Sequence, residues 1–423
     1  MGSLTGMRIL WVKADKLLPL HSGGNIRTYH VLRHLASEHD LTFYSYYGGQ
    51  HDNGYERDLQ QHLPGSVAVC TGARELTGIA RGLDYLTHLT AQPPYAVSRF
   101  ASFKVKEQIQ TWFREQRFDV AVCDFLDAAV NFPRRLTTPS VLFQHNVESE
   151  IWRRHAVTAA NPVKKMLYGM EFQKMSRYEQ IEVRKFQHVI AVSENDRGLM
   201  TKWVDASHVS VIPTGVDLAQ YHSDPSAPEP GPLVTFVGAM DWEPNVDGVE
   251  YFCSEVWPAI QAEVPGARFR VVGRNPDRRV EKWASVSIEV TGRVLSVVEH
   301  LRQSAVVIVP LRIGGGTRLK IYEAMAAAKA VVSTTIGAEG LDVHHGRDIV
   351  LADGSRSFAQ AVIMLLRDRE LRRRYEKAAA ETAARYDWPV IGRRFSDLLQ
   401  SVVTSSNQES MTRTEHELGR ARQ

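Results

Sequence analysis

The residues from Gly314 to Glu323 combine glycines, cations and a carboxylate at close spacing. Three consecutive glycines come first, and Thr317, Arg318 and Lys320 follow them. Free backbone N–H groups at a glycine loop and a helix N-terminus bind anions, and the two cations would face a bound phosphate. Glu323 follows a little over a helical turn later and can accept hydrogen bonds from a diol. Phosphates beside a diol describe a nucleotide. A glycine-rich turn before a solvated charged helix is the alternative.

The elements around this stretch must hold it at the end of a buried strand. Residues 305–309 are apolar and β-branched and end at a proline, which predicts a strand, and residues 318–328 are good helix formers. The chain also opens on a predicted strand, residues 7–12, followed by Gly23, Gly24 and a helical pattern. A glycine pair lets the backbone approach a ligand closely, although an ordinary turn explains it equally well.

Polar side chains lie at the C-terminal ends of two more predicted strands. Residues 119–124 form an apolar strand that ends on Asp124, with Asp127 just beyond it, and residues 140–146 form another that carries His145 near its end. In open α/β sheets, ligands bind outside the carboxyl ends of the strands. These side chains are therefore candidate site residues, while a purely structural role for a single histidine is an equal alternative.

Composition excludes several classes of protein. The 423 residues suggest two domains, and 43% hydrophobic with 23% charged residues is typical of a soluble globular chain. A net charge of +3 does not indicate nucleic-acid binding, and three scattered cysteines indicate neither a disulfide framework nor a zinc site.

No apolar run reaches the roughly 18 residues that span a bilayer, so we expect a cytoplasmic protein. The basic, aromatic helix predicted at residues 162–185 indicates either peripheral contact with acidic lipid or a solvated face.

A proline-rich linker divides the chain. Residues 223–232 contain four prolines and cannot continue a helix or an inner strand. Strands alternate with helices on both sides of it, which predicts two doubly wound α/β domains, residues 1–222 and 231–387. The polar segment from residue 406 to residue 423 is predicted to be a disordered tail.

Several motifs resemble family 4 of the retaining GT-B glycosyltransferases. Residues 211–217 are similar to the family's "IPNGVD" segment with Thr214 at the asparagine, and residues 238–249 resemble a branch tied to bacterial polysaccharide assembly. The resemblance also covers residues 314–328, and it implies a helix at about 388–405 that crosses back onto the first domain. It further implies two Rossmann-like domains that face each other across a cleft.

The resemblance also implies an activity. The expected reaction moves a hexose-type sugar from a nucleotide-diphosphate sugar, UDP- or GDP-linked, to a hydroxyl of a saccharide, lipid-linked or small-molecule acceptor. No cofactor or metal is expected, and attack occurs on the front face, with the donor phosphate taking the acceptor's proton. Two rival interpretations stay open on the same fold, a nucleotide-sugar 2-epimerase and a non-catalytic partner subunit. A dinucleotide oxidoreductase is disfavoured because no G-x-G-x-x-G follows the first strand.

Individual roles carry over from the resemblance. Glu323 matches the glutamate that binds the ribose hydroxyls, and His145 matches the histidine that contacts the donor sugar and helps to polarise the reacting centre. The diphosphate would face Gly23 and Gly24, and Asp124 or Asp127 would contact the acceptor. The remaining donor-binding candidates are Gly273, Arg274 and Val294 near the base, and Gly315, Gly316 and Thr317 in the glycine loop.

Two departures from the family pattern affect the mechanism. Gly315 stands where the family has the first of two paired glutamates, so recognition of the sugar must differ. The loop 238–245 carries no cation, although a diphosphate leaving group needs positive charge or a metal. No Asp-x-Asp occurs in the chain, so a metal is not indicated. We therefore expect Arg318 and Lys320 to be catalytic and to stabilise the departing diphosphate.

Overall fold

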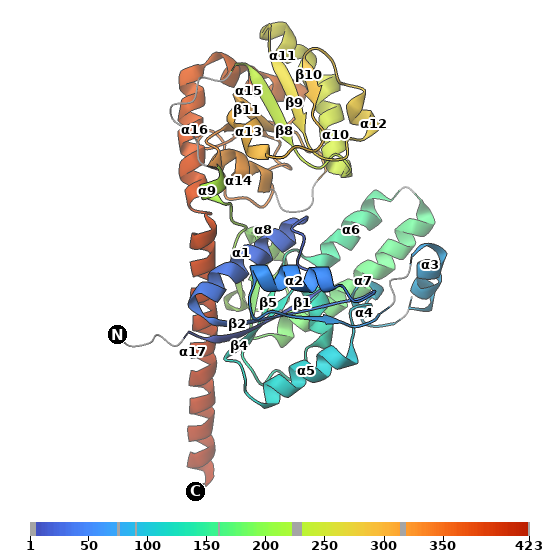
Figure 1. The fold of residues 1–423 in the computed structure, drawn as a ribbon, viewed down its shortest axis with the longest axis vertical. Coiled ribbons are helices and arrows are strands. Elements are labelled where there is room, and N and C mark those ends of the chain that lie inside the picture. The colour runs from blue at the N-terminus through green and yellow to red at the C-terminus, as the bar shows by residue number, and fades with distance from the viewer. Residues whose placement is uncertain are drawn as a thin grey trace. The chain divides into compact units, whose positions relative to one another are not determined.

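The protein forms two compact units, each an α/β arrangement (Figure 1). Unit 1 comprises Met1–Pro213 with Ile391–Gln423, and unit 2 comprises Thr214–Val390. The structure, a computed structural model, describes residues 6–73, 77–88, 91–159, 161–221, 231–313 and 319–421. In this part of the chain, no helix is both long and apolar enough to cross a membrane.

Unit 1 is built on a seven-stranded parallel sheet in the order β3-β2-β1-β4-β5-β6-β7. Continuous apolar runs form these strands because both faces of a parallel sheet are buried. The strand order reverses between β1 and β4, and ligands bind at such switch points. The strands are β1 Arg8–Ala14, β2 Asp40–Tyr47, β3 Val67–Cys70, β4 Val120–Asp124, β5 Ser140–Phe143, β6 His188–Ala191 and β7 Val209–Val211.

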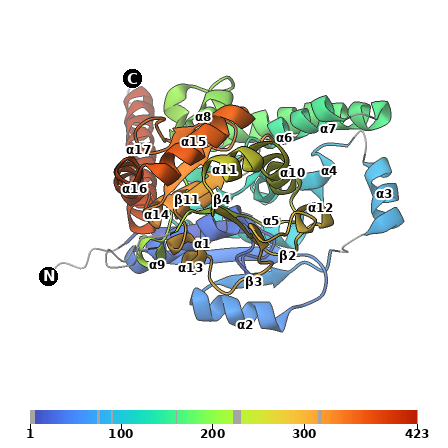
Figure 2. The same cartoon turned by 90° about the horizontal axis from the view of Figure 1, so that it is seen from above.

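Helices connect the strands of unit 1. The side chain of Ser22 caps the N-terminus of the first helix by accepting a hydrogen bond from the backbone of Asn25. Helices α6 and α7 pack side by side (Figure 1, Figure 2). The helices are α1 Gly23–Glu38, α2 Asn53–His62, α3 Gly78–Thr87, α4 Tyr95–Ser98, α5 Phe103–Arg114, α6 Glu148–Thr158, α7 Pro162–Lys185 and α8 Glu194–Met200, with 3-10 turns η1 Leu126–Asn131 and η2 Ala206–His208.

The last helix, α17 (Trp388–Ala421), contributes to the core of unit 1. Phe395 packs its ring against Trp11 and Phe143, with centroids 5.3 and 5.1 Å apart. The structure differs from the sequence-based expectation that residues 406–423 are disordered, because the helix continues to Ala421. The segment is polar but contains several good helix formers, so its polarity alone does not end the helix.

Unit 2 has a six-stranded parallel sheet in the order β10-β9-β8-β11-β12-β13, which reverses between β8 and β11. Its strands are β8 Leu233–Val237, β9 Arg268–Val272, β10 Ile288–Val290, β11 Val306–Val309, β12 Ala330–Ser333 and β13 Val350–Leu351. Its helices are α9 Leu218–Tyr221, α10 Glu243–Tyr251, the π-helix η3 Phe252–Val256, α11 Trp257–Glu263, α12 Arg278–Glu281, α13 Val297–Arg302, α14 Leu319–Ala326, α15 Ser355–Arg367 and α16 Arg369–Ala384.

The boundary between the units falls nine residues before the domain end predicted at residue 222. The backbone N–H of Val216 donates to the carbonyl of Tyr386 at 2.8 Å, and the N–H of Trp388 donates to the carbonyl of Val216 at 3.1 Å. The ring of Trp388 also covers Gly215, where a Cβ would lie 2.5 Å from it. Residues 214–221 therefore pack with unit 2, which a composition-based search for a linker does not detect.

Candidate functional site

A buried polar cluster lies at the carboxyl ends of β1, β4 and β5 in unit 1, at the switch point of the sheet. Asp124 is its centre: one carboxylate oxygen accepts from Thr28 Oγ1 at 2.8 Å and lies 3.5 Å from Lys13 Nζ. The other accepts from His145 Nε2 at 2.7 Å. The cluster consists of five side chains, each 4% exposed or less: Lys13, Arg27, Thr28, Asp124 and His145.

The hydrogen bonds define the protonation state of His145. Arg27 has only donors, so its Nη1, 2.8 Å from His145 Nδ1, must donate to that nitrogen. Nε2 then carries the hydrogen and donates to Asp124. Burial lowers the pKa of His145 to about 4, which keeps the ring neutral at pH 7. Both ring nitrogens are therefore engaged inside the cluster, and neither is free to accept a proton.

The carboxylate of Asp124 is held ionised. Burial by itself raises its pKa, but the positive charge of Lys13 and the hydrogen bonds from His145 and Thr28 outweigh burial and lower the pKa below its usual value. Since the side chain is fully buried and both oxygens have partners, Asp124 faces the cluster rather than solvent.

Phe125 connects this cluster to the first turn of α1. Its ring stacks on His145 with centroids 3.7 Å apart and an interplanar angle of 4°. A Cβ on Gly24 would lie 2.4 Å from that ring, so the glycine is required by the close approach of Phe125. Phe125 itself has φ +67°, an uncommon conformation for a residue with a large side chain. The structure thus brings Gly24, Asp124 and His145 together through a residue that the sequence analysis did not identify.

Asp127 differs from Asp124 in its surroundings. It lies on η1, is half-buried, and makes no side-chain hydrogen bond or ion pair with any residue that the structure describes. Burial and the like charge of Glu148 raise the pKa of Asp127 to about 7. Of the two aspartates predicted near the acceptor, Asp127 is therefore the one whose carboxyl group is available.

The raised pKa of Asp127 makes stability depend on pH. An unfolded aspartate titrates near about 4, so between about 4 and about 7 the folded protein holds a proton that the unfolded chain has released, and stability falls as pH rises through this range. We expect Asp127→Asn to remove this loss, so that its gain in thermal stability over the wild type is larger at pH 8 than at pH 5. The exposed Asp58→Asn is the matched control. A stability difference that is the same at both pH values would contradict this assignment.

In unit 2, Lys320 lies at the loop that follows β8. Its Nζ donates to Asn245 Oδ1 at 2.8 Å and lies 4.4 Å from the ring centroid of Phe236. A Cβ on Gly238 would be 2.8 Å from the same Nζ. Asn245 in turn donates to the carbonyl of Ala239 at 2.7 Å. The ammonium group of Lys320, on α14, therefore lies beside the 238–245 loop at the switch point of this sheet. The loop itself contains no cationic residue.

Glu323 lies three residues further along α14 and therefore on the same face of the helix as Lys320. The hydroxyl of Tyr221 donates to its carboxylate. Burial raises the pKa of Glu323, while Tyr221 and the charge of Lys320 oppose that rise. Lys320 and Glu323, the two predicted nucleotide-binding residues of this segment that the structure describes, are thus close together. Tyr221 is a partner of Glu323 that the sequence analysis missed.

The residues predicted near the base have supporting roles in the backbone. A Cβ on Gly273 would lie 1.7 Å from the carbonyl oxygen of Gly238, so only glycine permits this approach. The backbone carbonyl of Arg274 accepts from the N–H of Met240 at 2.9 Å. Both residues therefore shape the 238–245 loop, while Val294 is half-buried beside the fully exposed Leu295.

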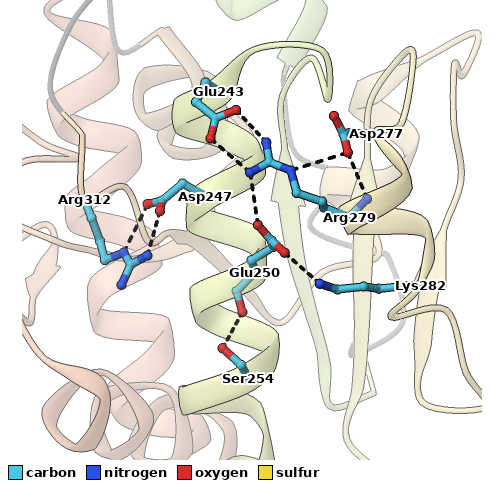
Figure 3. A network of polar contacts seen from close by, with 8 residues as sticks. All are labelled: Glu243, Asp247, Glu250, Ser254, Asp277, Arg279, Lys282 and Arg312. Atoms are coloured by element: carbon cyan, nitrogen blue, oxygen red, sulfur yellow. Dashed lines mark hydrogen bonds and ion pairs between the residues drawn. The ribbon is translucent and has the colours of Figure 1, made fainter. Parts of the chain in front are cut away.

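The chain is anchored just before the glycine loop. Arg312 donates to both carboxylate oxygens of Asp247 on α10, at 2.6 and 3.1 Å (Figure 3). Its guanidinium lies 4.7 Å from the ring centroid of Tyr251. On another side of α10, Glu250 binds Arg279 and Lys282 (Figure 3). Four predicted site residues lie outside the described part of the chain, and their roles stay predictions: Gly315, Gly316, Thr317 and Arg318.

A family model described as Glycosyltransferase Family 4 matches residues 21–220, and one described as Glycosyl transferases group 1 matches residues 231–368. The chain belongs to glycosyltransferase family 4. Together the two models cover most of unit 1 and most of unit 2, including α14 and the buried polar cluster except Lys13.

Individual proteins resemble this family 4 chain in sequence or in fold. The phosphatidyl-myo-inositol mannosyltransferase of Mycobacterium leprae is 29% identical over 229 residues, which are 52% of this chain and 60% of that protein. The chain thus matches little more than half the length of this relative. Similar solved structures include sucrose-phosphate synthase of Thermosynechococcus elongatus, with a TM-score of 0.68 and 16% identity; the match covers 94% of this chain and all of that one. They also include Anabaena HepE in complex with UDP and glucose, with a TM-score of 0.62 and 15% identity; the match covers 93% of this chain and all of that one. These similarities show the GT-B fold with two Rossmann-like domains.

Proposed function

We propose that the protein is a metal-independent, retaining glycosyltransferase. It would transfer a hexose-type sugar from a UDP- or GDP-sugar to a hydroxyl of a saccharide, lipid-linked or small-molecule acceptor in bacterial glycan synthesis. The observation that carries this proposal is the placement of Lys320 against the cation-free loop at the switch point of unit 2, with Glu323 three residues further along the same helix face. The names of relatives support it: one is a mannosyltransferase, and one neighbour was solved with UDP and glucose.

The proposed chemistry is charge stabilisation at a diphosphate leaving group. The bond between the anomeric carbon and the diphosphate oxygen breaks, and its electron pair leaves with the diphosphate. The acceptor oxygen bonds to the same face of that carbon, and its proton passes to the diphosphate. Lys320, with Arg318, would stabilise the negative charge that develops on the leaving group, which is commonly the largest contribution to such a reaction. Glu323 would hold the ribose hydroxyls.

Unit 1 would supply the acceptor side. Asp127, whose half-buried carboxyl group has no partner among the described residues, is the proposed contact for an acceptor hydroxyl. His145 is assigned a positioning role, because its nitrogens are bound to Arg27 and Asp124 and its ring face carries Phe125. Through Phe125 it would fix Gly24 and the first turn of α1, whose N–H groups suit an anion.

Thermal stabilisation by nucleoside diphosphates tests the proposed donor site. In the presence of EDTA, one of UDP, GDP, ADP and dTDP should raise Tm, since a ligand at 100 times its Kd stabilises by about 2.7 kcal/mol. We expect Glu323→Ala to abolish that shift, because the ribose loses its hydrogen-bond acceptor. Glu281→Ala, which removes an exposed carboxylate from α12, is the matched control and should keep the shift. If no diphosphate stabilises the wild type, the donor site is not as proposed.

A further inference from the structure

Unit 1 carries a basic groove that the proposed transfer reaction does not use. Its volume is about 1310 Å³, and η1 and the C-terminal half of α7 contribute much of its wall. Of its lining residues in the described ranges, Glu182 alone carries a carboxylate. The basic groove is defined by six lining cations: Lys106, Arg134, Arg135, Arg177, Arg184 and Lys185.

The basic groove lies at the opposite edge of the sheet from the candidate site. Three of its lining residues, Leu136, Gln187 and His208, come shortly before the starts of β5, β6 and β7. Asp124 and His145 come at the other ends of their strands, and all these strands are parallel. A partner in the basic groove would therefore leave the carboxyl edge of unit 1 open to a substrate.

Most of the positive charge in the basic groove is not neutralised. The side chains of Lys106, Arg134, Arg135 and Arg177 are exposed, and none makes a hydrogen bond or ion pair within the described ranges of the chain. The single carboxylate, Glu182, is already ion-paired with Lys185. The groove therefore has a net positive charge that favours a partner with several negative charges.

Exposed apolar side chains accompany these cations. Ile181 lines the basic groove with 61% of its surface exposed, and it follows Arg177 by one turn of α7. Phe103 is 81% exposed and precedes Lys106 on the same face of α5. A soluble anion would bind the cations without needing these apolar groups. A lipid surface engages both, because basic residues attract anionic headgroups while aromatic and aliphatic side chains enter the interface.

We propose that the basic groove docks unit 1 onto a membrane surface that contains anionic phospholipid. The cations bind headgroup phosphates, and Ile181 and Phe103 insert into the boundary between headgroups and acyl chains. Docking at this edge does not depend on the nature of the sugar donor.

Vesicle co-sedimentation tests this docking surface. The full-length protein should bind vesicles of phosphatidylcholine mixed with phosphatidylglycerol and dissociate from them in high salt. It should not bind vesicles of phosphatidylcholine alone. Arg134→Gln with Arg135→Gln should weaken binding by about 30-fold, since each basic residue near an anionic surface contributes about fivefold. Ile181→Ser with Phe103→Ser should also weaken it. Tm and donor turnover should be unchanged in both variants, because these residues lie away from the site.

A matched pair on the same helix is the control. Lys164→Gln with Lys165→Gln removes two adjacent exposed cations from the first turn of α7, outside the basic groove, and should bind like the wild type. The proposal is overturned if this pair, rather than the arginine pair, abolishes binding, or if the wild type does not bind anionic vesicles. It is also overturned if soluble polyphosphate binds the groove while Ile181→Ser with Phe103→Ser leaves vesicle binding unchanged, because the partner would then be a soluble polyanion.

Discussion

Replacing Lys320 and Arg318 together by alanine is expected to lower kcat for sugar transfer by about 10²–10³-fold, the loss typical when a group that stabilises developing charge is removed. Lys320 is a cation that the structure places at the loop after β8, 2.8 Å from Asn245. Without it, the diphosphate would leave into a site whose loop supplies no positive charge. Donor turnover at saturating nucleotide sugar, followed as release of the nucleoside diphosphate, measures this loss.

The control for this experiment is another lysine of unit 2. Lys282→Ala removes the same charge, but Lys282 is paired with Glu250 at 2.8 Å beside α12 (Figure 3). We expect near wild-type kcat for Lys282→Ala. The single variant Lys320→Ala separates the lysine from Arg318, which lies outside the described residues. Normal turnover by the double variant would refute the role that we assign to these cations.

Replacing Asp124 by alanine is expected to destabilise unit 1 by about 3–5 kcal/mol, because breaking a buried charge network leaves its cations uncompensated. Lys13 would keep its charge at a site that is 3% exposed, and both Thr28 and His145 would lose a hydrogen-bond partner. Urea unfolding followed by the fluorescence of Trp11 and its neighbours would record the loss. Nucleotide binding to unit 2 should persist in the folded variant.

Asp119→Ala is the comparison for this loss. Asp119 immediately precedes β4 and pairs with Arg8 at 2.6 Å, but both side chains are partly exposed. Water replaces the lost partner there, so the destabilisation should be much smaller. Equal losses for the two aspartates would show that the polar cluster does not contribute as a buried network.

The alternation of strands and helices was predictable from the sequence because buried parallel strands appear as continuous apolar runs. Residues 7–12, for example, predict the strand that the structure has as Arg8–Ala14. The pairing of Lys320 with Asn245 was not predictable, since the two residues are 75 positions apart. The sequence did indicate that this loop lacks a cation, and it led to the prediction that Arg318 and Lys320 supply the missing charge.

The polar cluster of unit 1 was predicted only in part. Asp124 and His145 lie at strand ends, where polar residues are candidate site residues. The partners that set their protonation states, however, lie far away in the chain. Arg27 and His145 are 118 residues apart. Lys13 offered a usable signal, because a charged residue inside an apolar strand must have a buried partner. Phe125 offered none, since its role depends on an unusual backbone angle.

The stereochemistry of donor breakdown shows whether the enzyme retains the anomeric configuration and whether it needs a metal. The enzyme would be incubated with its nucleotide sugar, excess EDTA and no acceptor, so that water slowly takes the place of the acceptor hydroxyl. Proton NMR would then record the first-formed sugar before its anomers equilibrate. We expect release of a sugar with the same anomeric configuration as the donor, at a rate unaffected by EDTA. A first product of inverted configuration, or loss of turnover with EDTA, would contradict it.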